Sequence, residues 1–263
     1  MFSASGVLLV IAATLMAGQP EGPLIIGGGD PARGVLVNRS PGVEPFALPD
    51  PAHPTIVFVH GFNPLPRVVH FAMTERLAES LERRGRNDFN VLDWDWNAAS
   101  FTGLKTSTNS AEAIRQGQRL GWTLWQAGLD PGQVHLIGHS AGAIVATSAA
   151  DFFARRLGRP VAQLTLLDPA AFYHTTIFEE LAAGTLSPLV ENYWSPGPSA
   201  YGKEAAMPGV RNFRVDGPAS FGGVLCPLRS DHLFIVRWYF RTIEDPRVVE
   251  GFNTSRLLIE PRR

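Results

Sequence analysis

Residues 136–143 read LIGHSAGA, and this stretch decides how the chain is interpreted. Apolar residues lead into Gly138, Ser140 stands between two glycines, and small residues follow. A buried strand that ends at Gly138 and a helix that begins after Ser140 must be joined by a very tight turn, which the flanking glycines permit. This G-x-S-x-G pattern between a strand and a helix predicts a serine nucleophile at Ser140, at the carboxyl end of a sheet.

Strand-like and helix-like segments alternate on both sides of this turn. Strands are expected at residues 34–38, 55–61, 89–96, 133–138 and 161–168, and helices over 69–85, 109–128, 141–158 and 231–243. Alternating strands and helices with short connections predict a mostly parallel sheet that helices cover on both faces. Residues 170–225 break this rhythm, and we expect a long functional loop there.

The helix over 109–128 carries glycines on its inward face. Gly117 and Gly121 are spaced four residues apart, in line with the apolar residues Ile114 and Leu124. Each glycine costs a helix about 1 kcal/mol relative to alanine. We therefore expect these glycines to let the helix approach the sheet closely.

Length and charge narrow the class of protein. The chain has 263 residues, of which 45% are hydrophobic, and a formal net charge of −1. These values predict one domain with a substantial core. The sequence contains no cluster of lysines and arginines, so we expect no nucleic-acid partner. The single cysteine, Cys226, cannot form an intrachain disulfide and gives no information on the redox compartment.

The first residues predict export. Residues 5–18, SGVLLVIAATLMAG, form a short apolar run that has the length of a secretory signal and is short for a membrane span of about 20 residues. The preceding MFSAS has no basic residue, so a buried N-terminal segment and an uncleaved anchor stay open as alternatives. We expect a signal peptide at residues 1–18, an irregular lead-in with an early strand at 19–54, a catalytic domain at 55–263, and a secreted or periplasmic protein.

A serine hydroxyl needs a base to become a nucleophile. His232 is the expected base, because it follows the last long loop at the start of the final helix, in the chain order serine, carboxylate, histidine. We expect His139 to point away from the reacting centre. The remaining histidines are assigned to surface, loop, turn or packing positions: His53, His60, His70, His135 and His174.

Two carboxylates compete for the role of orienting the base. Asp168 ends the strand over 161–168, and Asp216 follows a short strand-like run that is closer in sequence to His232. Such a carboxylate holds the imidazole in one tautomer and stabilises the imidazolium. Spacing alone leaves both residues open.

A carbonyl group that is attacked by serine develops negative charge on its oxygen, and two backbone N–H groups must receive that charge. One donor is expected from Ala141, directly after the nucleophile. The other is expected from the loop after an earlier strand, where VHGFNP at 59–64 places the N–H of Phe62.

Five stretches in this order resemble the pancreatic-type lipase family of α/β-hydrolases: HGF at 60–62, VLDWDWN at 91–97, VHLIGHSAGA at 134–143, LLDPAAF at 166–172 and CPLRSDH at 226–232. The resemblance covers roughly residues 55–175 and, more loosely, the region of His232. It implies an α/β-hydrolase fold, favours Asp168 over Asp216, and supports Phe62 and Ala141 as oxyanion donors. The family's disulfides are absent, since Cys226 stands alone.

We therefore expect a serine hydrolase that cleaves carboxylic esters, of lipase or esterase type, without a metal or an organic cofactor. Its partners would be ester or lipid small molecules, with transient contact to a lipid surface. Two alternatives stay open. One is an acyltransferase or thioesterase that uses the same three residues, and the other is a catalytically silent lipid-binding relative.

Overall fold

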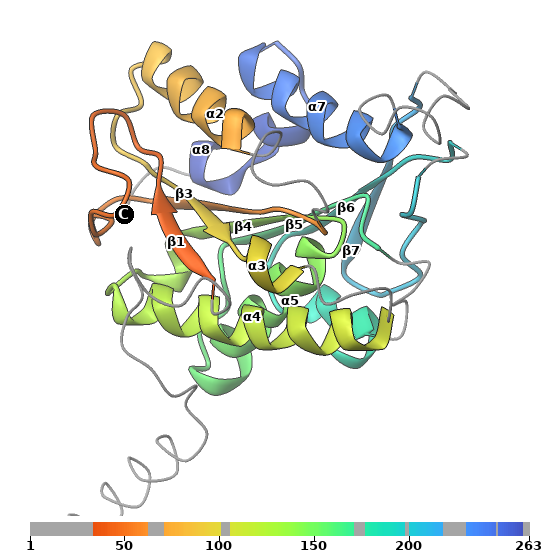
Figure 1. The fold of residues 1–263 in the computed structure, drawn as a ribbon. Helices are drawn as coiled ribbons and strands as arrows, with labels where there is room; N and C mark the ends of the chain where they lie inside the picture. The colour runs from red at the N-terminus through yellow and green to blue at the C-terminus, as the bar shows by residue number, and fades with distance from the viewer. Residues whose placement is uncertain are drawn as a thin grey trace, which may run out of the picture.

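A seven-stranded sheet forms the centre of the molecule, with helices against both of its faces (Figure 1). The computed structural model describes residues 34–62, 71–100, 106–170, 177–197, 200–217, 230–245 and 247–259. The expected signal peptide at 1–18 lies outside these residues, as do His70, His174 and Cys226. Within the described ranges no helix has the length and apolar character needed to cross a membrane.

The sheet has the strand order β1-β3-β2-β4-β5-β6-β7. Its members are β1 (Val35–Asn38), β2 (Thr55–Val59), β3 (Asn90–Asp95), β4 (Val134–His139), β5 (Gln163–Leu167), β6 (Val190–Trp194) and β7 (Val210–Arg214). Only β1 runs antiparallel to its neighbour, and the other five pairs are parallel. The prediction of a mostly parallel α/β-hydrolase sheet is confirmed.

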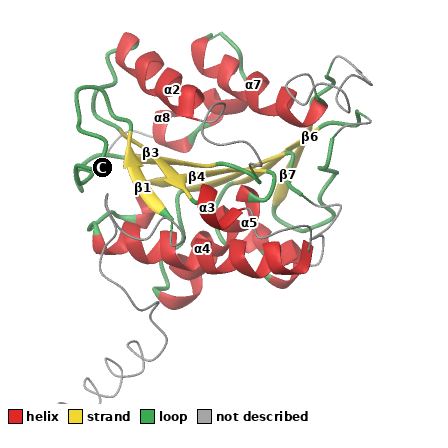
Figure 2. Cartoon of the chain, in the orientation of Figure 1, coloured by secondary structure: helices red, strands yellow, loops and turns green. Residues whose placement is uncertain are grey.

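Helices cover the two faces of the sheet as two layers (Figure 2). One layer holds α4 (Thr106–Gln126) and α5 (Gly142–Asp151), and the other holds α2 (Phe71–Arg83), α7 (Asp231–Glu244) and the short α8 (Arg256–Ile259). Another short helix, α3 (Asn97–Ser100), follows β3.

Alternate residues of each inner strand serve the two layers. In β2, Val57 and Val59 belong to the core cluster under α4 and α5, whereas Ile56 and Phe58 belong to the cluster under α2 and α7. Every residue of β2 is buried, which is why its sequence, TIVFV, is almost continuously apolar.

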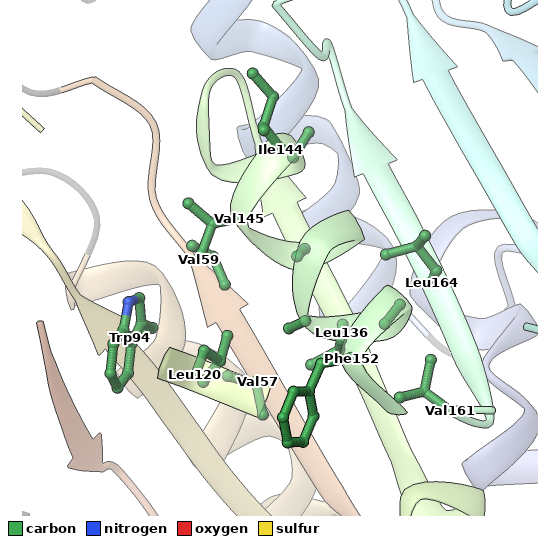
Figure 3. Close-up of a cluster of buried hydrophobic side chains, with 14 of the residues drawn as sticks. Val57, Val59, Trp94, Leu120, Leu136, Ile144, Val145, Phe152, Val161 and Leu164 are labelled. Atoms are coloured by element: carbon green, nitrogen blue, oxygen red, sulfur yellow. The ribbon is translucent and has the colours of Figure 1, made fainter. Parts of the chain in front are cut away.

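The glycines of α4 allow close contact with α5 rather than with the sheet. A Cβ added at Gly117 would lie 2.4 Å from the carbonyl oxygen of Val145, and one at Gly121 would lie 2.8 Å from the Phe152 ring. The expectation that these glycines bring α4 close to the sheet is therefore wrong, because they bring it close to α5. Leu120, which lies between these glycines in sequence, belongs to the same buried cluster as Val145 and Phe152 (Figure 3).

Two strands lie in the segment that was expected to be a loop. The segment 170–225 contains β6 and β7, which extend the sheet beyond β5. The hydrophobic pattern did not predict β6, because two of its buried residues, Glu191 and Asn192, are polar. Their side chains are bonded to other polar groups, among them Gln163 and Asn212. A strand of this kind lacks the apolar signature on which its prediction depends.

Candidate active site

Ser140 occupies a strained turn between β4 and α5. Its φ is +55°, a left-handed value that non-glycine residues rarely adopt. A Cβ at Gly138 would lie 2.5 Å from the carbonyl oxygen of Gly142, and one at Gly142 would lie 2.3 Å from that of His60. Both glycines of the motif are thus required by backbone contact. The backbone at Ser140 therefore makes the tight turn between strand and helix that the sequence predicted.

The loop after β2 lies directly against the serine. A Cβ at Gly61 would lie 2.6 Å from Cβ of Ser140 and 3.3 Å from its Oγ. Phe62 follows in this loop with its side chain 40% exposed, and Ala141 is the residue before the first turn of α5. The first N–H groups of a helix have no partner within the helix. The candidate oxyanion donors, Phe62 and Ala141, therefore lie on loops that meet at Ser140.

His60 holds this loop in place through both of its ring nitrogens. Its Nδ1 donates to the carbonyl oxygen of Gly61 at 2.8 Å, and its Nε2 accepts from the backbone N–H of Trp96 at 3.2 Å. Trp96 Nε1 in turn donates to the carbonyl oxygen of His60 at 2.8 Å. The ring lies in a buried position, so the histidine that was assigned to a turn is a clamp for the candidate oxyanion loop.

Asp168 presents its carboxylate from the end of β5, fully buried and with a left-handed φ of +40°. Its Oδ2 accepts a hydrogen bond from His232 Nδ1 at 2.5 Å and one from the backbone N–H of Tyr201 at 2.9 Å. Its Oδ1 accepts from the N–H of Gly202 at 3.0 Å and that of Ser195 at 3.5 Å. Several N–H donors to one buried carboxylate fix its orientation.

His232 lies in the first turn of α7. Ser230 caps this helix, and its hydroxyl oxygen accepts from the N–H of Leu233 at 3.2 Å. The His232 ring contacts two other rings, that of His139 at 4.4 Å and that of Tyr201 at 4.5 Å between centroids. Because the Asp168 carboxylate can only accept, Nδ1 of His232 carries a proton, and in the neutral ring Nε2 keeps the lone pair.

The structure separates the two candidate carboxylates. Asp168 lies against His232, whereas the Asp216 side chain is 69% exposed and accepts a bond from Arg214 Nε at 3.0 Å. No described hydrogen bond joins Ser140 Oγ to His232. Such catalytic bonds are often long before substrate binds and tighten in the complex.

His139 differs from its expectation. It was expected to point away from the reacting centre, yet its ring lies under that of His232, and its Nε2 lies 3.2 Å from the carbonyl oxygen of His232. The sequence signal was the period of two in β4, which places residues 135, 137 and 139 on one face. That face is covered by α7, since Ile137 packs in the same cluster as Ile235 and Val236.

His53 and His135 lie outside the site. His53 is near the surface, 3.7 Å from Asp50. His135 is fully buried, with Nδ1 3.1 Å from Ser255 Oγ and Nε2 2.8 Å from Thr165 Oγ1. Burial lowers the pKa of His135 to about 3. Within the described part of the chain no group of three or more histidine, cysteine or acidic residues is arranged to hold a metal ion.

Comparison with known protein families gives a match. The family model of Lipase matches residues 50–183, slightly more than half of the chain. No curated protein matches the chain.

Several solved structures resemble the chain at low identity. An esterase of Pyrobaculum calidifontis has a TM-score of 0.46 and 16% identity, over 91% of this chain and 90% of that one. Esterase 2 of Thermogutta terrifontis, phosphoramylated by tabun, has a TM-score of 0.45 and 16% identity, over 86% and 93% of the two chains. A hydrolase of Oleispira antarctica has a TM-score of 0.44 and 13% identity, over 78% and 95%.

The family match includes β2, the HGF loop, the Ser140 turn and Asp168, which are the parts of the chain that form the centre of the site. The chain therefore belongs to the lipase family of α/β-hydrolases.

Proposed function

We propose that this protein is a serine hydrolase that cleaves carboxylic esters through an acyl-enzyme intermediate. Membership of the lipase family indicates ester hydrolysis. The observation that supports the mechanism most is the 2.5 Å hydrogen bond between the buried Asp168 carboxylate and His232 Nδ1. The His232 ring also contacts the ring of His139, the residue before Ser140. No step of this chemistry requires a metal or an organic cofactor.

In the proposed acylation step, Ser140 Oγ attacks the ester carbonyl carbon while His232 Nε2 takes the hydroxyl proton. The carbonyl oxygen becomes negative and is received by the backbone N–H groups of Phe62 and Ala141. When the tetrahedral intermediate collapses, the bond to the alcohol oxygen breaks, and His232 gives its proton to that oxygen.

In the proposed deacylation step, a water molecule takes the place of the alcohol. His232 accepts a proton from the water, whose oxygen attacks the acyl carbon. When the bond between that carbon and Ser140 Oγ breaks, His232 returns the proton to Oγ and the carboxylic acid is released. Asp168 remains ionised throughout, because its role is to hold Nδ1–H and to stabilise the imidazolium. The four donors to its carboxylate suit that role.

The test is a series of nitrophenyl esters from acetyl to palmitoyl, measured below and above the solubility limit of each ester. We expect turnover of at least part of the series by the wild type. The Ser140→Ala variant should be slower by about 10⁵–10⁶-fold, because the residues of such a triad act as a unit. The dependence on chain length separates esterase from lipase behaviour. Absence of turnover across the whole series would contradict the proposal.

We also propose that the protein is exported, on the strength of the apolar run at residues 5–18. Expression of the full chain, followed by cell fractionation and N-terminal sequencing, tests this. A mature protein that begins near residue 19 in the exported fraction supports export. A cytoplasmic protein that retains its first residue contradicts it.

A further inference from the structure

Two histidines from distant parts of the chain lie in contact beside the candidate nucleophile. His139 is the last residue of β4, and His232 belongs to the first turn of α7. Their ring centroids are 4.4 Å apart with an angle of 37° between the planes, and His139 Nε2 is 3.2 Å from the backbone oxygen of His232. His139 is only 2% exposed, so this contact is part of the packed interior.

The partners of His139 define its protonation. A carbonyl oxygen can only accept, so Nε2 of His139 carries the proton and donates it to the backbone of His232. A neutral ring satisfies this bond. In the proposed reaction His232 becomes an imidazolium, and a second positive charge at 4.4 Å would oppose that step. The geometry therefore favours a neutral His139 with its proton on Nε2.

The bond to Asp168 does not by itself fix the His232 ring. One hydrogen bond at Nδ1 fixes the position of that nitrogen but not, by itself, the tilt of the ring plane, on which the direction of Nε2 depends. His139 restrains this tilt at two points, since it holds the backbone of His232 and supports one part of its ring. Tyr201 restrains the ring from another side, edge-on at 87°.

We infer that His139 is a positioning residue that aims Nε2 of His232 at Ser140; this role rests on the proposed hydrolase function. His139 acts through His232 and needs no contact with the substrate. The effect is confined to proton transfer, because alignment of the base matters more in the transition state than in substrate binding. Loss of this support should lower kcat and leave KM nearly unchanged.

The test uses two substitutions at position 139 and one matched control. His139→Phe keeps a ring of similar shape but removes the donor, whereas His139→Gln removes the ring but places an amide N–H where Nε2 stood. His135→Gln is the control, because His135 is buried on the same strand face but bonds to Ser255 and Thr165, away from the site. Thermal unfolding of each variant reports its stability separately.

The expected result is a decrease of kcat by about 10–100-fold in His139→Phe, with KM within about twofold of the wild type. His139→Gln should recover at least a third of the wild-type kcat, and His135→Gln should keep the wild-type kcat although it unfolds at a lower temperature. A wild-type kcat in His139→Phe would overturn the inference. So would equal losses of kcat in all three variants, which would indicate a general effect of buried histidine removal.

A second measurement is independent of turnover. Two-bond nitrogen–proton NMR spectra of the histidine rings assign the tautomer of His139, and relaxation rates report the motion of the His232 ring. A proton on Nε2 of His139, together with a more mobile His232 ring in His139→Phe, supports the inference even if no nitrophenyl ester is hydrolysed and the proposed function fails. Unchanged motion of that ring overturns it. If His139→Phe does not fold, the tautomer of the wild-type protein decides: a proton on Nδ1 of His139 instead of Nε2 would remove the bond to the His232 carbonyl oxygen and overturn the inference.

Discussion

Asp168 and His232 are joined by a hydrogen bond of 2.5 Å between residues that lie 64 positions apart in the chain. Asp168 comes from the end of β5 and His232 from the first turn of α7, so the bond connects the sheet to the helix layer that covers it. The carboxylate is fully buried and the His232 side chain is 13% exposed. The bond therefore orients a ring that still reaches the surface of the site.

The first prediction concerns this bond. Asp168→Asn should lower kcat by about 10⁴-fold, because an amide in place of the carboxylate favours the wrong tautomer of His232. Asp216→Asn is the matched control and should change kcat by less than about twofold, since Asp216 is exposed and bonded to Arg214. Steady-state rates on one soluble nitrophenyl ester decide the matter. The reverse order of the two losses would show that Asp216 is the acid.

The second prediction concerns the loop at the nucleophile. In Gly61→Ala the new methyl group would lie 2.6 Å from Cβ of Ser140, so the loop must move and carry the Phe62 N–H with it. Loss of one aligned oxyanion donor costs about 10²–10³ in kcat. In the control, Gly132→Ala, the closest atom is 3.4 Å away on the Asp130 side chain, and full activity is expected. Wild-type kcat in Gly61→Ala would exclude this loop from the oxyanion hole.

The third prediction concerns acid stability. Burial lowers the folded-state pKa of His135 to about 3, below its ordinary value of about 6.5. Between these two pH values the unfolded chain binds a proton that the folded chain does not bind, so the free energy of unfolding falls as the pH is lowered. One such group contributes about 1.4 kcal/mol per pH unit.

Urea unfolding at pH 7, 6, 5 and 4 measures this effect. The wild type should lose stability steadily below about pH 6.5, and His135→Gln should show a flatter curve from a lower starting value. Parallel curves for the two proteins would show that other groups cause the acid sensitivity.

The fourth prediction concerns the contact of α4 with α5. Gly117→Ala gains about 1 kcal/mol in helix propensity, but its methyl group would lie 2.4 Å from a backbone oxygen of α5. Overpacking of this kind costs about 1–3 kcal/mol and is relieved only by separating the helices. We expect a net loss of up to about 2 kcal/mol in the free energy of unfolding, measured in denaturant. A more stable variant would contradict the close packing of the two helices.

Most of the fold could be predicted from the sequence, because the inner strands have a clear apolar pattern. Buried parallel strands such as TIVFV at 55–59 are apolar throughout, and the turn at Ser140 has a motif of its own. The sequence analysis did not predict the strand β6, because its buried polar residues depend on partners such as Gln163 and Asn212, which only the folded chain brings near. Its prediction requires knowledge of those partners.

Part of the candidate site could also be predicted from the sequence. Ser140 stands in a local motif, but the choice between Asp168 and Asp216 depends on the direction in which β5 and α7 bring their ends together. The positions of His60 and His139 are also tertiary properties. Their bonds run to Trp96 and to the backbone of His232, which are 36 and 93 residues away in sequence. Spacing along the chain does not predict such contacts.

The measurement that tests the central claim most directly is covalent labelling of Ser140. The wild type is incubated with a fluorophosphonate probe, digested, and analysed by mass spectrometry. We predict one adduct per chain, located on Ser140, absent from Ser140→Ala and formed much more slowly in His232→Ala. An adduct on another residue, or ester hydrolysis that persists in Ser140→Ala at the wild-type rate, would contradict the account.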